Sequence, residues 1–313
     1  MAPMPEPKPG WVRPERGIAS LSRFMIWLTL RVGRPFGEAI LPFITLYFLL
    51  TARQARRASR QYLARVLDRP VHMLDVARHF HTFAAAILDR VFFLSGRYKG
   101  YKIDIDGLDC VHAAMAGGRG CILLGAHIGS FEALRSVGRM SPFPVRVLMF
   151  RRNAGAPTRL LEQLAPEFAR NIIDIGEPDA MIRVQESLAR NELVGMLGDR
   201  APGHEKSVLT PFLGGMAAFP AGPLLVASML GVPVILFSGV RTGYRQYTVR
   251  FELLAEQITI PRRQRAQGLA TWMGHYARWM ERLCRAHPYN WFNFHDVWVA
   301  PQVGKHGENH DGP

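Results

Sequence analysis

Cysteine is scarce in this chain of 313 residues, which contains only Cys110, Cys121 and Cys284. The three are widely spaced, odd in number and without a Cys-x-x-Cys pair, so the sequence excludes a disulfide framework and a cysteine-based zinc site. A chain of this kind is typical of a reducing compartment. No motif in the chain predicts a cofactor.

Acidic residues and long hydrophobic runs are also few. The 25 Asp and Glu stand against 39 Lys and Arg, a net charge of +14, which excludes an acidic disordered protein. Two N-terminal apolar runs, 24–30 and 39–50, are shorter than the roughly 18 residues that a membrane-spanning helix needs, and no signal-peptide cleavage site follows them. The charge instead predicts an anionic partner: nucleic acid, lipid headgroups or an acidic substrate.

Much of the positive charge lies beside these apolar runs. Between Arg31 and Arg65 there are seven Arg and one Glu, a net charge of +6. Arginines next to an aromatic-rich apolar segment are typical of an interfacial anchor on an anionic cytoplasmic leaflet, so we expect residues 20–67 to lie on a membrane surface. The alternative is a buried helical hairpin followed by a solvated basic helix. No recognition motif accompanies the charge, which argues against nucleic acid.

The character of the chain changes near residue 99. Residues 1–17 and 301–313 are predicted to be disordered tails, and residues 18–98 a helical, membrane-associated segment. Residues 99–300 alternate short β-rich runs with helix-like segments, and several runs are apolar at every position, as in strands buried on both faces. We therefore predict an α/β domain with a mainly parallel central sheet flanked by helices. The predicted strands are 101–105, 120–126, 144–150, 171–175, 193–198, 233–239 and 246–254, and the predicted helices are 131–137, with Ser130 as N-cap, 180–191, 221–230 and 266–286.

The most informative motif follows the strand predicted at 120–126. His127 lies at the carboxyl end of that strand, where ligand sites of open α/β sheets are found. Gly129 permits a tight turn, which would let the chain fold back and bring Glu132 to the imidazole. A carboxylate on one ring nitrogen fixes the tautomer and raises the basicity of the other nitrogen, as a general base requires. For the isolated pair, a capping or core histidine is the alternative.

Further blocks follow in order. Residues 127–132 read His-x4-Glu, 149–153 read Met-Phe-Arg-Arg-Asn, 198–200 read Gly-Asp-Arg, 210–215 and 219–223 follow, and an apolar strand comes at 232–236. Together they resemble the lysophospholipid acyltransferase superfamily, in particular the branch that contains the lauroyl and myristoyl acyltransferases of lipid A biosynthesis. The resemblance extends over residues 20–298.

The resemblance implies an acyltransferase at the cytoplasmic face of a bacterial inner membrane, bound as a monotopic or peripheral protein. Its donor would be an acyl-acyl carrier protein or an acyl-coenzyme A, and its acceptor a hydroxyl or amine of a lipid or glycolipid. His127 would remove the acceptor proton and Glu132 would orient the imidazole, without a covalent enzyme intermediate. The implied substrate-binding residues are Arg151, Asn153, Asp199, Arg200 and Gly222.

Several roles for these residues stay open. Arg151 or the backbone amides near Gly222 would stabilise an oxyanion. Arg151 and Asn153 would alternatively hold a phosphate, or lie in a solvated loop. Asp199 and Arg200 would bind substrate or form an ion pair that shapes the pocket.

Three rival functions compete with this interpretation. Ser130 beside His127 would make a serine esterase, but the chain has no Gly-x-Ser-x-Gly elbow. A metal site could be drawn from His72, Asp75, His79 and His81, although exposed helix histidines explain them better. A non-catalytic membrane-surface adaptor would use only the anchor and the basic helix.

The C-terminal segment 287–298 lacks the basic ending typical of lipid A enzymes. It is more similar to family members linked to other lipids, such as aryl polyene or amino-acid lipids. The acceptor, the donor carrier and the acyl length therefore stay open.

Overall fold

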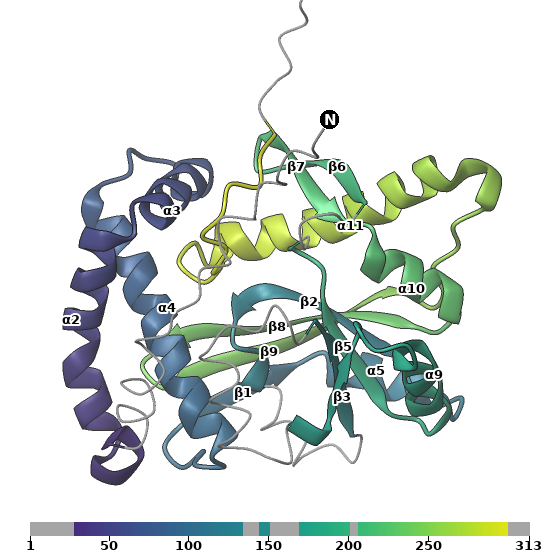
Figure 1. Ribbon diagram of the computed structural model, residues 1–313, viewed down its shortest axis with the longest axis horizontal. Helices are drawn as coiled ribbons and strands as arrows, with labels where there is room; N and C mark the ends of the chain where they lie inside the picture. The colour runs from purple at the N-terminus through teal and green to yellow at the C-terminus, as the bar shows by residue number, and fades with distance from the viewer. Residues whose placement is uncertain (1–27, 134–143, 151–168, 201–205, 300–313) are drawn as a thin grey trace, which may run out of the picture.

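A seven-stranded sheet forms the centre of the computed structural model (Figure 1), which describes residues 28–133, 144–150, 169–200 and 206–299. The strand order is β1-β9-β8-β2-β5-β3-β4. The strands are β1 (Lys102–Asp106), β2 (Ile122–Gly129), β3 (Val145–Met149), β4 (Ile172–Asp174), β5 (Leu193–Leu197), β8 (Val234–Gly243) and β9 (Gln246–Ala255). All neighbours pair in parallel except β8 and β9. The prediction of an α/β fold with a mainly parallel sheet is therefore confirmed.

Strand β2 is apolar on both faces because both faces of the sheet are covered. Ile122 and Leu124 belong to a core cluster that includes residues of α9 (Ala180–Ala189), α10 (Gly222–Leu230) and α11 (Arg265–Ala286). Cys121 and Leu123 belong to a second cluster, with residues of α5 (Leu108–Met115) and the last turn of α4 (Met73–Leu94). In a strand that is covered on both faces, the carboxyl end rather than a face is open to solvent.

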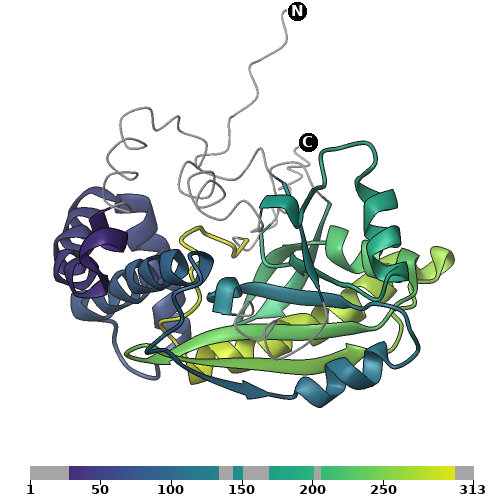
Figure 2. The same cartoon turned by 90° about the horizontal axis from the view of Figure 1, so that it is seen from below.

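The N-terminal helices form a layer at one end of the sheet, as both views show (Figures 1 and 2). Helix α2 (Arg34–Thr51) packs along α4, and α3 (Arg53–Val66) follows after a bend of 97°. Among the described helices, no single one is long and apolar enough to cross a membrane, whereas α2 and α3 taken together pass that test with the bend between them.

One pair of strands is not predicted by the sequence pattern. Strands β6 (Ser207–Phe212) and β7 (Gly215–Pro220) form an antiparallel hairpin beside α11. In β6, Thr210 and Phe212 are buried and their neighbours are exposed or half-buried. The alternation covers only six residues and includes Pro211, so the β pattern was weak.

The helix predicted at 131–137 is described only in part. Residues Phe131–Ala133 form a 3-10 turn, and the following residues lie outside the described ranges. The hydroxyl of Ser130 donates to Glu132 Oε2 at 3.1 Å, and the predicted helix that it would cap lies mostly outside the described residues.

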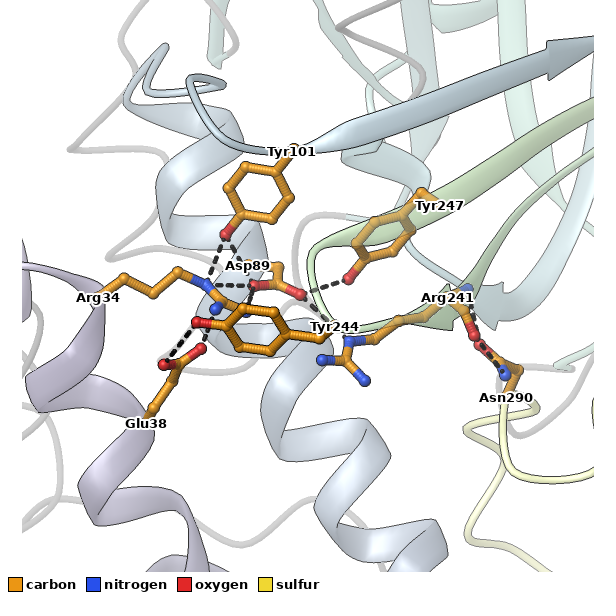
Figure 3. Close-up of polar contacts among 8 residues, drawn as sticks. All are labelled: Arg34, Glu38, Asp89, Tyr101, Arg241, Tyr244, Tyr247 and Asn290. Atoms are coloured by element: carbon orange, nitrogen blue, oxygen red, sulfur yellow. Dashed lines mark hydrogen bonds and ion pairs between the residues drawn. The ribbon is translucent and has the colours of Figure 1, made fainter.

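A buried carboxylate ties the N-terminal helices to the sheet (Figure 3). Asp89 of α4, which is fully buried, accepts hydrogen bonds from Arg34 of α2, from Tyr101 directly before β1 and from Tyr247 of β9. Its second oxygen also pairs with Arg241 of β8 at 3.3 Å. A buried charge is costly unless it is paired and hydrogen-bonded, and this one is satisfied by groups from four separate elements. The cluster therefore fixes α2 and α4 against the strand that adjoins β2.

Candidate active site

His127 lies at the carboxyl end of β2, as predicted, and the backbone there is tightly held. Its carbonyl accepts a hydrogen bond from Phe292 N at 2.8 Å, and Gly129 N donates to Asn290 O at 2.9 Å. Gly129 has a φ of +71°, and a Cβ at this position would lie 1.9 Å from the carbonyl oxygen of Gly239. Only glycine permits both this conformation and this close approach.

The partner of the His127 imidazole is Asp199, which follows β5. His127 Nδ1 lies 2.7 Å from Asp199 Oδ1, and the backbone amide of His127 donates to the same carboxylate at 3.1 Å. The indole Nε1–H of Trp291 donates to Asp199 Oδ2 at 2.9 Å. Asp199 is 1% exposed, whereas the His127 side chain is 31% exposed, so the pair has a buried anchor and an accessible ring.

The electrostatics of the pair suit a general base. Burial would raise the pKa of Asp199, but the His127 imidazole, the Arg200 guanidinium and the Trp291 indole together hold it well below its usual range. Burial and the nearby Arg200 lower the pKa of His127, and the Asp199 carboxylate opposes that shift. At neutral pH an ionised Asp199 therefore accepts from Nδ1–H of a neutral imidazole. Nε2, which has no hydrogen bond among the described contacts, carries the free lone pair.

Glu132 does not hold the imidazole in the way its spacing suggested. Its Oε1 lies 2.5 Å from Arg90 Nε of α4, and its Oε2 accepts from Ser130. The 3-10 turn that begins at Phe131 directs the carboxylate toward α4, while Asp199 occupies the Nδ1 side of the ring. The expected contact between Glu132 and His127 is therefore corrected: the carboxylate at Nδ1 comes from residue 199, far along the sequence.

Two arginines and a second histidine lie close enough to the imidazole to interact with it electrostatically. The electrostatic effects of Arg200 and Arg90 both lower the pKa of His127. The pKa of His295 is lowered first by burial and then by Arg200 and His127, which places its ring in the same neighbourhood. Arg200 donates through Nη2 to the carbonyl of Phe292.

The other predicted substrate-binding residues are distributed unevenly. Gly222 is the first residue of α10, after β7, and no described contact joins it to His127 or Asp199. Arg151 and Asn153 lie outside the described residues. The site that the structure brings together thus consists of His127, Asp199 and Arg200.

The residues weighed as a metal site have other partners. Asp75 forms an ion pair with Arg69 and accepts from Tyr289. His79 is fully buried, with Nδ1 2.9 Å from Ser59 Oγ and Nε2 2.9 Å from the carbonyl of Trp291. Over the described ranges, no group of three potential ligands is placed to hold a metal ion.

Sequence reasoning missed two residues beside the site, Trp291 and Arg90. Trp291 lies in a segment without regular secondary structure, and Arg90 lies in the long helix α4, so no local spacing connects either residue with His127. The run 287–298 differs from the sequences of lipid A enzymes in its ending, and this difference does not connect it with His127. Pairing at such separations cannot be derived from one sequence.

The fold and the site define an α/β enzyme with a carboxylate-supported histidine at the carboxyl end of a central strand. The profile of the bacterial lipid A biosynthesis acyltransferases matches residues 4–299. The chain therefore belongs to this family and is an acyltransferase. No curated protein matches the chain.

Proposed function

We propose that the enzyme transfers a fatty acyl group from a thioester to a hydroxyl or amine of a lipid acceptor, with His127 as general base. The observation that carries the proposal is the 2.7 Å contact between His127 Nδ1 and the buried Asp199. This contact leaves Nε2 unprotonated, on a side chain that is 31% exposed. Family membership supports the reaction class, and the geometry supports the assignment of the base.

The proton and the bonds balance in two steps. His127 Nε2 takes the acceptor proton as the acceptor oxygen or nitrogen attacks the thioester carbonyl, which forms a tetrahedral intermediate. Its collapse breaks the carbon–sulfur bond, and the imidazolium returns the proton to the departing thiolate. Asp199 stabilises the imidazolium between the two steps, as buried carboxylates do in triad enzymes. No covalent enzyme intermediate is needed.

Arg200 is the nearest candidate for binding negative charge. Its guanidinium is close enough to His127 to lower the pKa of the imidazole, so it would stabilise a developing oxyanion or a phosphate of the substrate. Glu132 has a different role in this proposal: it pairs with Arg90 and so offsets part of the charge by which Arg90 lowers the pKa of His127. Ser130, whose hydroxyl donates to Glu132, has no nucleophilic role in this proposal.

Lipid A-like precursors are the acceptors that family membership favours. The donors in this proposal are an acyl-acyl carrier protein or an acyl-coenzyme A. The non-basic ending at 287–298 keeps other lipids, such as aryl polyene or amino-acid lipids, among the acceptors to be tested. Lipid profiling by mass spectrometry of cells with and without the gene tests this directly. We expect one lipid to lose one acyl group when the gene is removed. An unchanged lipid profile would contradict the proposed reaction.

The enzyme is further proposed to lie on the cytoplasmic face of the inner membrane through α2 and α3. One face of α2 is buried against the protein at Leu41 and Thr45, whereas Phe43, Tyr47 and Leu50 on the opposite face are 72%, 58% and 66% exposed. An apolar helix face left exposed beside cations is typical of an interfacial helix.

The cations lie on the next helix. Arg53, Arg57 and Arg60 of α3 are exposed and spaced for one helical face, opposite the buried Tyr62 and Leu63. Arginines in this position attract anionic headgroups, each contributing about 1 kcal/mol near the surface. The apolar face of α2 can thus bury side chains in the membrane interface, and the basic face of α3 can attract anionic headgroups.

A vesicle-binding assay with the full chain tests the surface. Replacing Arg53, Arg57 and Arg60 by Gln should weaken binding to vesicles that contain anionic lipid by roughly 100-fold at low salt, and abolish most of the salt dependence. The matched control replaces Arg262, Arg263 and Arg265, which are also exposed and lie in the 3-10 turn before α11 and at its first residue; this end of α11 is far from α3 (Figure 1). Equal losses of vesicle binding in the two variants would contradict a specific membrane-binding face formed by α2 and α3.

A further inference from the structure

Segment 290–292 completes the sheet where β5 leaves it. β5 pairs with β2 as far as Gly125, and the chain then turns away with Asp199. Beyond this point Ile128 of β2 forms an antiparallel bridge with Trp291. The C-terminal segment therefore lies beside the last residues of β2, in contact with the residues that flank His127.

Trp291 is fixed on every side. Its side chain is fully buried, and its ring packs edge-on against Tyr62 at 4.9 Å and Phe212 at 5.3 Å. Its carbonyl oxygen accepts a hydrogen bond from Nε2–H of the buried His79, whose Nδ1 in turn accepts from the Ser59 hydroxyl. With ring and backbone both held, the indole N–H has a single direction, toward Asp199 Oδ2.

We propose that Trp291 is a positioning residue of acyl transfer: its indole Nε1–H holds the Asp199 carboxylate in the orientation in which Oδ1 binds His127. The carboxylate has two ends, one on the imidazole at 2.7 Å and one on the indole at 2.9 Å. Rotation of the carboxylate about its Cβ–Cγ bond would break both contacts together. Because the indole is held in place, the Asp199 carboxylate and the His127 imidazole that it binds are held in place as well. This inference rests on the proposed function.

Charged groups reach His127 from several elements, and the indole balances them. Arg200 and Arg90 destabilise the imidazolium, His295 does the same when it is protonated, and Asp199 stabilises it. The indole donor spreads part of the negative charge of Asp199. Removal of that donor makes the carboxylate a stronger base, which stabilises the imidazolium and raises the pKa of His127.

The test compares Trp291→Phe with Trp298→Phe. Both substitutions remove one indole donor, but Trp298 donates to the carbonyl of Phe212 rather than to Asp199. We expect Trp291→Phe to lower kcat by about 10- to 100-fold, the usual effect of a hydrogen bond to a charged group, with KM for the thioester unchanged. The acid limb of the pH profile should move to higher pH. Trp298→Phe should retain the wild-type kcat and pH profile.

A double-substitution cycle separates positioning from general destabilisation. If Trp291 acts through Asp199, adding Trp291→Phe to the Asp199→Asn enzyme should lower kcat further by less than about 3-fold. Fully additive losses, or a Trp291→Phe enzyme with wild-type kcat and acid limb, would overturn the inference. If Trp291→Phe does not fold, benzothienylalanine incorporated at position 291 replaces the N–H by sulfur and preserves the ring. We expect the enzyme with benzothienylalanine at position 291 to show the same loss of kcat and the same shift of the acid limb. A wild-type kcat and pH profile in that protein would also overturn the inference.

His127→Ala, measured in parallel, separates the two levels of the argument. Loss of transfer in His127→Ala together with wild-type behaviour of the position 291 variant contradicts only the role of Trp291. Retained transfer in a folded His127→Ala protein contradicts the proposed function itself.

Discussion

Replacing Asp199 by Asn removes the charge behind the imidazole while nearly preserving volume. The contact to His127 Nδ1 is 2.7 Å long, and the gross attraction between imidazolium and carboxylate at that distance is on the order of 6 kcal/mol at an effective dielectric constant of about 20. The amide also presents N–H groups that are unable to accept from Nδ1–H. We therefore expect kcat to fall by about 10²- to 10⁴-fold, the range that a positioned general base contributes.

The assay measures acyl transfer by mass spectrometry and, independently, the Nδ1 proton of His127 by NMR of histidine-labelled protein. Asp199→Asn should lose the strongly hydrogen-bonded Nδ1 proton signal. Glu132→Gln is the matched control, because Glu132 is also a buried carboxylate of the site but contacts Arg90 and Ser130. The control should retain the signal. The opposite pattern, with the signal lost in Glu132→Gln and retained in Asp199→Asn, would refute the pairing.

Three further predictions concern the pH profile and the support of the site. Because the pKa of His127 is lowered, kcat/KM should fall only below about pH 6.5, and an acid limb above that pH would contradict this. Burial lowers the pKa of His79 from 6.5 to about 4. The neutral imidazole therefore makes its full contribution to the free energy of unfolding above pH 6.5, and this free energy should fall by about 3 kcal/mol as the pH falls to 4. Denaturant titrations should show a smaller decline in His79→Gln. Gly129→Ala should destabilise the protein far more than Gly214→Ala, which has a similar φ of +72° but open space around its Cβ, and equal thermal shifts would contradict the close-approach argument.

Those parts of the fold that depend on local pattern were predictable. Strand β2 is apolar at consecutive positions because both of its faces are covered, and the predicted position of His127 at its carboxyl end follows from that run. The final helix, predicted at 266–286 from its apolar spacing, runs from Arg265 to Ala286.

The partners of the site depend on contacts between distant segments, and these were not predictable. Glu132 is the nearest carboxylate in sequence to His127, yet the turn that begins at Phe131 carries it to α4. Asp199 reaches the imidazole because β5 is the spatial neighbour of β2, a relation fixed by strand order rather than by spacing. Trp291 reaches Asp199 only because the C-terminal segment replaces β5 at the end of β2.

The most direct test of the central claim is acyl transfer by the purified, folded His127→Ala protein. An under-acylated lipid A precursor in mixed micelles serves as acceptor, with an acyl-acyl carrier protein and an acyl-coenzyme A as alternative donors, and mass spectrometry counts the acyl chains added. If His127 is the general base, wild-type enzyme adds one chain and the variant is slower by at least about 10²-fold. Turnover near the wild-type rate in the folded variant would contradict the account.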